Sequence, residues 1–91
     1  MRVRYMRIAD ADLRGIIRFG VENNLSDPVT FVLGLRARFD HLADIEHPGR
    51  KGRLHGTLEW VITGTPYIAV LRREGQTMKI YRVLHGAQQW P

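Results

Sequence analysis

The 91-residue sequence contains no cysteine, which excludes disulfide bonds and thiol chemistry and fits a reducing compartment. No stretch approaches the ~20 consecutive apolar residues that a membrane-spanning helix needs. The first residues also lack the apolar segment of a secretory signal peptide. We therefore expect a cytoplasmic protein that begins at Met1 and makes no contact with membranes.

Motifs for metals, nucleotides and serine nucleophiles are missing as well. The sequence has no phosphate loop, no dinucleotide fingerprint and no Gly-x-Ser-x-Gly. Its four histidines are scattered, without a second ligand three or four residues away on a helix. We expect neither a metal nor a cofactor. The length fits one domain over residues 1–91, and 44% hydrophobic residues suffice for one core.

Lysine is scarce, because twelve of the 14 cationic residues are arginine, and the net charge is +5. The planar arginine group can bind phosphate or carboxylate with two parallel hydrogen bonds. The cations gather in residues 2–7, 50–53 and 72–82. This pattern indicates either a nucleic acid or an acidic protein as partner. The alternative is a basic chain that is simply soluble.

Apolar periodicity predicts one strand and two helices in the first half of the chain. Residues 2–8 alternate as a strand does. A helix should follow, with Asp10 as its cap and Asp12 in its first turn, and should end at Asn23-Asn24. Asp27-Pro28 is typical of a second helix start. The apolar stripes of the two helices predict an antiparallel hairpin.

Three strands are expected in the second half, over residues 57–63, 67–73 and 78–85. Short turns join them, which favours antiparallel pairing. The cationic segment from His47 to Arg53, broken by proline and glycine, is expected to be irregular. The prediction is an α+β fold in the order β-α-α-β-β-β, with the helix hairpin packed on a small, mostly antiparallel sheet.

His85 is the residue best suited to acid–base chemistry, since it ends a strand and Gly86 follows. With Arg72 and Arg82 across the sheet, it could cleave RNA without a metal. Histidine would move a proton while the arginines stabilised the developing phosphate charge. The alternative, which we favour on the residues alone, is that His85 hydrogen-bonds the C-terminal tail and holds Trp90 in place.

Several short motifs in the second half of the chain resemble those of a known protein family. They are Pro48-Gly49-Arg50, Gly56-Thr57, Thr65-Pro66-Tyr67-Ile68 and Val83-Leu84-His85-Gly86-Ala87-Gln88-Gln89-Trp90-Pro91. With Ala11-Asp12-Leu13 in the first helix, they make the chain similar to the RelE/ParE superfamily. The members of that superfamily are toxins of bacterial type II toxin–antitoxin modules, which include plasmid-stabilisation systems, and the same element order is typical of them.

The resemblance implies a cognate antitoxin, with a helical, acidic segment lying across the hairpin and the basic edge of the sheet. The apolar residues expected to bind it are Leu13, Ile17, Val32, Leu35 and Trp90. It also implies a target, either DNA gyrase for ParE-like members or the ribosome with its mRNA for RelE-like members. The cations expected to contact nucleic acid or target are Arg50, Lys51, Arg53, Arg73 and Lys79.

The sequence departs from the nuclease pattern of the RelE-like branch. Positions where those members carry basic catalytic residues fall on Glu59, Val61, Ile68 and Gln88. This favours gyrase inhibition, with a ribosome-dependent endoribonuclease using His85, Arg72 and Arg82 as the alternative. Leu58 stands where many relatives have arginine, which marks either a packing residue or an attenuated toxin that retains only antitoxin binding.

Overall fold

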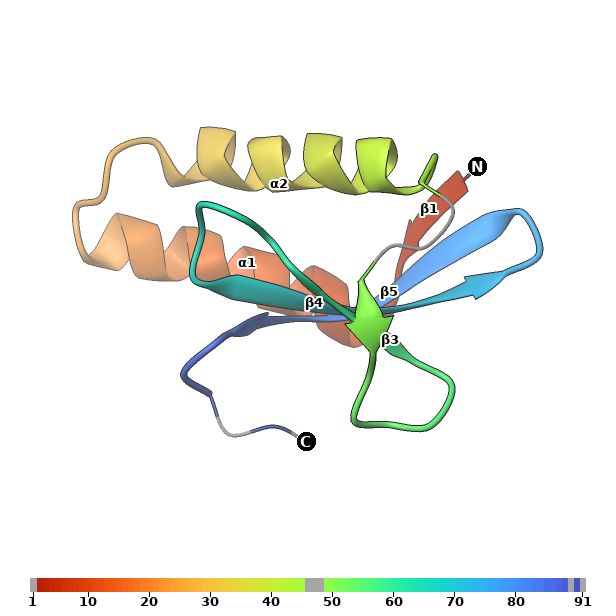
Figure 1. Ribbon diagram of the computed structural model, residues 1–91. Coiled ribbons are helices and arrows are strands. Elements are labelled where there is room, and N and C mark those ends of the chain that lie inside the picture. The colour runs from red at the N-terminus through yellow and green to blue at the C-terminus, as the bar shows by residue number, and fades with distance from the viewer. Residues whose placement is uncertain (1, 46–48, 89, 91) are drawn as a thin grey trace.

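The computed structural model describes residues 2–45, 49–88 and 90, and consists of two helices packed on one face of a five-stranded sheet (Figure 1). The elements are β1 (Arg2–Tyr5), α1 (Arg7–Glu22), α2 (Pro28–Leu42), β2 (Arg50–Lys51), β3 (Leu58–Val61), β4 (Tyr67–Glu74) and β5 (Thr77–His85). The strand order is β1-β5-β4-β3-β2. Strand β1 runs parallel to β5 and the other pairs are antiparallel. The predicted α+β architecture is confirmed.

The longest ladder joins β4 to β5, from the pair Tyr67–His85 to the pair Glu74–Thr77. Gly75 supplies the left-handed φ of 59° that the tight turn between them requires. A register shift between Val70 and Leu71 inserts one extra residue in β5. Because side chains alternate along a strand, this ladder decides which residues face the helices and which face away.

Helix α1 begins earlier than the sequence predicts. Strand β1 ends at Tyr5, and the Met6 amide donates to the Ile80 carbonyl at 2.9 Å, so the chain leaves the sheet and turns directly into the helix at Arg7. Asp10 was predicted as the cap, which is wrong: Met6 holds the cap position and no side chain bonds there. Asp10 instead forms an ion pair with Arg14 one turn later.

The junction of the two helices follows the prediction. Helix α1 ends at Glu22, and Asp27 caps α2 by accepting from the Thr30 amide at 3.3 Å, with Pro28 as the first helical residue. A Cβ on Gly20 would lie 2.5 Å from the Cβ of Pro28. The absence of a side chain at this buried glycine therefore lets the two helices approach closely.

The segment expected to be irregular contains one short strand. Arg50 and Lys51 pair with Glu59 and Leu58 to form β2, so the prediction is wrong at these two residues. His47 and Pro48, which belong to the same prediction, lie outside the described residues. Pairing here is possible because Gly49, with φ of 92°, brings the backbone close to Glu59, where a Cβ would meet the carbonyl oxygen at 2.5 Å.

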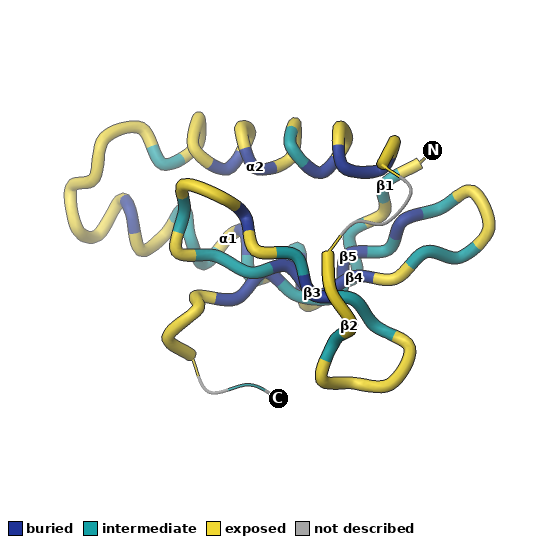
Figure 2. Tube along the Cα trace, in the orientation of Figure 1, coloured by how far each residue is buried: buried dark blue, intermediate teal, exposed yellow. Residues whose placement is uncertain are grey.

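The hydrophobic core lies between the hairpin and the sheet, as the buried segments in Figure 2 show. Phe39 of α2 is fully buried at its centre, and its ring meets the rings of Tyr5 and Trp60 edge-on at 5.8 and 5.6 Å. Edge-to-face pairs at such distances add to the energy of burial. Burial also raises the pKa of the Tyr5 hydroxyl to about 12.

Phe39→Ala should destabilise the fold by about 3–5 kcal/mol, because it removes the central ring and leaves a cavity between sheet and hairpin. Phe19→Ala is the matched control, since Phe19 lies on α1 with 55% of its surface exposed. We expect the control to change the free energy of unfolding by under about 0.5 kcal/mol. Urea denaturation of both variants measures this, and equal losses would contradict the assigned core.

Candidate functional site

The sheet has a helix face, which packs on α1 and α2, and an outer face, which points away from them. Leu71 and Ile80 are direct partners in the ladder and belong to the core, so they define the helix face. Val70 and Arg82 are the neighbouring partners and therefore point to the outer face. The C-terminal tail and the loop after β2 run along this outer side in Figure 1.

His85 lies on the helix face, at the end of β5. It pairs with Tyr67, and the two rings meet edge-on at 5.7 Å. The Ala87 amide donates to Nδ1 of His85 at 3.1 Å, while the His85 amide donates to the side chain of Gln88 at 2.8 Å. His85 thus hydrogen-bonds the beginning of the tail, as the favoured alternative from the sequence anticipates.

Arg82 is bound to a carboxylate that comes from α1. Its Nε and Nη2 donate to Asp12 at 2.9 and 3.2 Å, and Asp12 also accepts from the Val83 amide at 2.9 Å. These hydrogen bonds raise the pKa of Arg82. The guanidinium also lies 5.4 Å from the centre of the Trp90 ring. Asp12, predicted as a helix-dipole residue, instead fastens α1 to β5.

The three expected catalytic residues are not brought together. Arg72 lies two residues from Val70 on β4, so it shares the outer face with Arg82. His85 is three residues beyond Arg82 on β5 and points to the opposite face. Arg72 pairs with Lys79, far along the ladder from the pair Tyr67–His85. The ladder therefore separates the histidine from both arginines.

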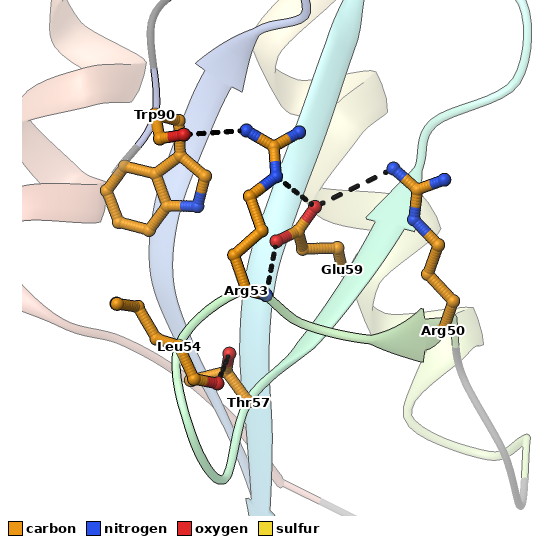
Figure 3. A network of polar contacts seen from close by, with 6 residues as sticks. All are labelled: Arg50, Arg53, Leu54, Thr57, Glu59 and Trp90. Carbon is orange, nitrogen blue, oxygen red and sulfur yellow. Dashed lines mark hydrogen bonds and ion pairs between the residues drawn. The ribbon is translucent and has the colours of Figure 1, made fainter.

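A buried carboxylate organises the cationic loop after β2, as Figure 3 shows. Glu59 is only 2% exposed, and it accepts from the Arg53 amide at 2.9 Å. The Arg53 Nε and the Arg50 Nη2 lie 3.5 and 3.7 Å from its other oxygen. Arg53 also donates to the Trp90 carbonyl at 2.8 Å. Two of the expected target-binding cations thus hold the loop and the tail to the sheet.

The other three expected target-binding cations lie in different places. Arg73 points to the helix face and donates to the Ala43 carbonyl, just after α2, at 3.1 Å. Lys79 is on the outer face, 3.2 Å from Glu74. Lys51 is exposed in β2. Their assignment to target binding stays a prediction, and the structure gives the five cations no common surface.

The five residues expected to bind the antitoxin are divided between core and surface. Leu13, Val32 and Leu35 are at most 5% exposed and fill the space between hairpin and sheet. Ile17 and Trp90 are half-buried. The assignment stays a prediction, but in this fold only the last two present surface to a partner. The apolar stripe that predicted the other three is the stripe that packs on the sheet.

A different set of apolar side chains is exposed on the hairpin. The periodicity of the sequence gives no sign of it, because these residues do not belong to the apolar stripes that pack on the sheet. Its larger members are Ile8, Phe19, Val21, Leu25, Val29, Phe31 and Leu33. A hollow of about 350 Å³ opens between the closed end of the hairpin and Tyr67 and His85. Phe19, Leu25 and Phe31 line this hollow, and exposed apolar groups around one hollow are typical of protein-binding surfaces.

Among the described residues, no group of three or more histidine or carboxylate side chains could hold a metal ion. Neither helix in the described part of the chain is long and apolar enough to cross a bilayer.

Fold and surfaces together define a small α+β protein with exposed apolar side chains on its hairpin and a cationic sheet that holds His85 apart from Arg72 and Arg82. The family model for the ParE toxin of the type II toxin–antitoxin system parDE matches residues 3–90. The chain belongs to this family, within the RelE/ParE superfamily that the motifs resemble.

One solved structure, described as a chromosomal ParDE toxin–antitoxin system from P. aeruginosa, is similar in fold. Its TM-score is 0.81 at 22% identity, with 93% of this chain and 95% of that chain covered. At this identity the likeness shows the fold alone. No curated protein matches the chain.

Leu58, where many relatives have arginine, has a structural role in this chain. It pairs with Leu71 across β3 and β4 and packs against the core while partly buried. The structure contains the contact that the packing explanation expects. The other explanation, an attenuated toxin, stays a prediction.

Glu59→Gln should release the loop after β2 and the tail, because it removes the charge that Arg50 and Arg53 meet on the outer face. We expect a loss of about 1–3 kcal/mol in the free energy of unfolding and faster tryptic cleavage after Arg53. Glu74→Gln is the control, since Glu74 is far more accessible to solvent than Glu59 and pairs near the surface contribute about 0–1 kcal/mol. Unchanged cleavage in Glu59→Gln would contradict the role of this carboxylate.

Proposed function

We propose that this ParE-family toxin arrests growth by inhibiting DNA gyrase in the cytoplasm, and that a cognate antitoxin neutralises it. Family membership supports both parts. The observation that carries the choice of target is the register of β4 and β5, which leaves His85 on one face of the sheet and Arg72 and Arg82 on the other. General acid–base cleavage of RNA needs these groups around one phosphate.

The contacts of each residue argue further against RNA cleavage. Arg82 is held by Asp12 and lies beside the Trp90 ring, so its guanidinium is already engaged. Nδ1 of His85 accepts from the tail. The outer face instead offers cations and a packed tail, which suit binding to another macromolecule. The protein acts in this proposal as an inhibitor and catalyses no reaction.

The antitoxin is proposed to cover the hairpin. Phe19, Leu25 and Phe31 are exposed around the hollow at its closed end, and covering them would bury apolar surface that the described chain leaves open. An amphipathic helix laid on this surface would use apolar anchors one turn apart. Acidic residues on that segment would meet the arginines of the hairpin and sheet, which favours rapid association and makes binding sensitive to salt.

Brief induction of the toxin in growing cells should arrest growth and trigger a DNA-damage response, while new mRNA 5′ ends do not accumulate within codons. His85→Gln should remain fully toxic, because the proposal gives this residue no catalytic role. Mapping 5′ ends and following growth in both strains measures this. Cuts within translated codons that disappear in His85→Gln would establish the endoribonuclease instead, and normal growth with intact messages would indicate an attenuated toxin.

Leu25→Ser with Phe19→Ser should weaken antitoxin binding roughly 100-fold or more, because both side chains line the hollow and each buried side chain of this size contributes about 1.5–3 kcal/mol. Both side chains are more than half exposed, so the fold should persist. Val61→Ser, an equally apolar exposed change on β3, is the control. Isothermal titration with the purified antitoxin measures the affinity, and unchanged binding by the double variant would place the antitoxin elsewhere.

A further inference from the structure

Four cations lie together on the outer face, on the part of the sheet that the tail leaves open. Strand alternation puts Arg2 and Arg4 of β1 on this face, because Val3 and Tyr5 pack against the core. Arg4 is the direct partner of Lys79 on β5, and Lys79 is the direct partner of Arg72 on β4. Three cations therefore stand in one row across neighbouring strands, about 4.8 Å apart from strand to strand.

The charge of this row is only partly balanced. Glu74 is the acid within reach: it lies 3.2 Å from Lys79 and 4.0 Å from Arg72, and the Tyr81 hydroxyl donates to it at 3.1 Å. The hydrogen bonds from Lys79 and Tyr81 lower the pKa of Glu74. Arg2 and Arg4 are exposed, and no acidic side chain in the described part of the chain pairs with either. Four cations against one carboxylate leave a net charge of +3 on this surface.

We propose that this surface, made of Arg2, Arg4, Arg72 and Lys79, binds the phosphate backbone of duplex DNA. It differs from the set that the sequence suggested, of which Arg50 and Arg53 are held by Glu59 and Arg73 faces the helices. Phosphate contacts need only cations and carry no sequence preference. The inference rests on the proposed function for its setting, since gyrase holds DNA where the toxin acts.

DNA fits this surface better than an acidic protein does. Protein interfaces depend on apolar and aromatic anchors at their centre. In the described chain, the large apolar side chains that are exposed lie outside β1, β4 and β5, mostly on the hairpin. Strands β1, β4 and β5, which carry the four cations, thus offer charge without a large exposed apolar side chain, whereas the hairpin offers such side chains. The two faces of the protein are suited to different partners.

The test measures binding of the full chain to a fluorescent duplex by anisotropy, over a series of salt concentrations. The logarithm of affinity should fall with the logarithm of salt with a slope of about −2.7 to −3.6 for three or four phosphate contacts. The double variant Arg2→Gln/Arg4→Gln should lose roughly tenfold or more in affinity near 0.1 M salt and reduce the slope by about 1.8. Arg2→Lys/Arg4→Lys should retain the slope.

Arg14→Gln/Arg18→Gln is the matched control, because it removes the same charge from exposed positions on α1. It should keep the wild-type slope. Equal losses in both glutamine variants, no binding by the wild type, or tighter binding to a poly-glutamate peptide than to DNA would each overturn the inference. Gyrase supercoiling is assayed separately: inhibition without DNA binding overturns this inference alone, and DNA binding without inhibition overturns the proposed function alone.

Discussion

The antiparallel ladder between β4 and β5 is the constraint on which the other features depend. It is the longest pairing in the sheet, and it sits at the centre with β1 on one side and β3 on the other. Since neighbouring side chains on a strand point to opposite faces, its register assigns Leu71 and Ile80 to the core and Arg72 and Arg82 to the outer face. The same register places His85 beside Tyr67 under the hairpin. Core formation and the separation of His85 from Arg72 and Arg82 have one cause.

Two carboxylates then fix what lies on the outer face. Asp12 reaches from α1 to Arg82, and Glu59 holds Arg53, which in turn binds the Trp90 carbonyl. Both carboxylates have little contact with solvent and therefore need charged partners, because an unpaired buried carboxylate is strongly disfavoured. The tail is packed for this reason, and several of the arginines that make the sequence basic act within the fold. The cations of β1 and of the far end of the β4–β5 ladder take no part in this packing of the tail.

Much of the fold could be predicted from local patterns, and most of the site could not. Asp27-Pro28 marked the start of α2, and the alternating strands with short turns gave the antiparallel order. The start of α1 was wrong because the backbone bond between Met6 and Ile80 sets it, and no side-chain signal reports that contact. Leu13, Val32 and Leu35 showed which stripe is apolar, but not that the sheet covers it. The burial of Glu59 depends on the loop before it and on contacts of that loop with the tail, which is distant in sequence.

We propose that this ParE-family toxin stops growth through gyrase. The most direct measurement is the supercoiling of relaxed plasmid by purified gyrase, with the toxin added at rising concentration and then titrated with its antitoxin. We expect supercoiling to fall with toxin dose, and we expect His85→Gln to inhibit as well as the wild type does. Added antitoxin should restore gyrase activity. Full gyrase activity in the presence of excess folded toxin would contradict it.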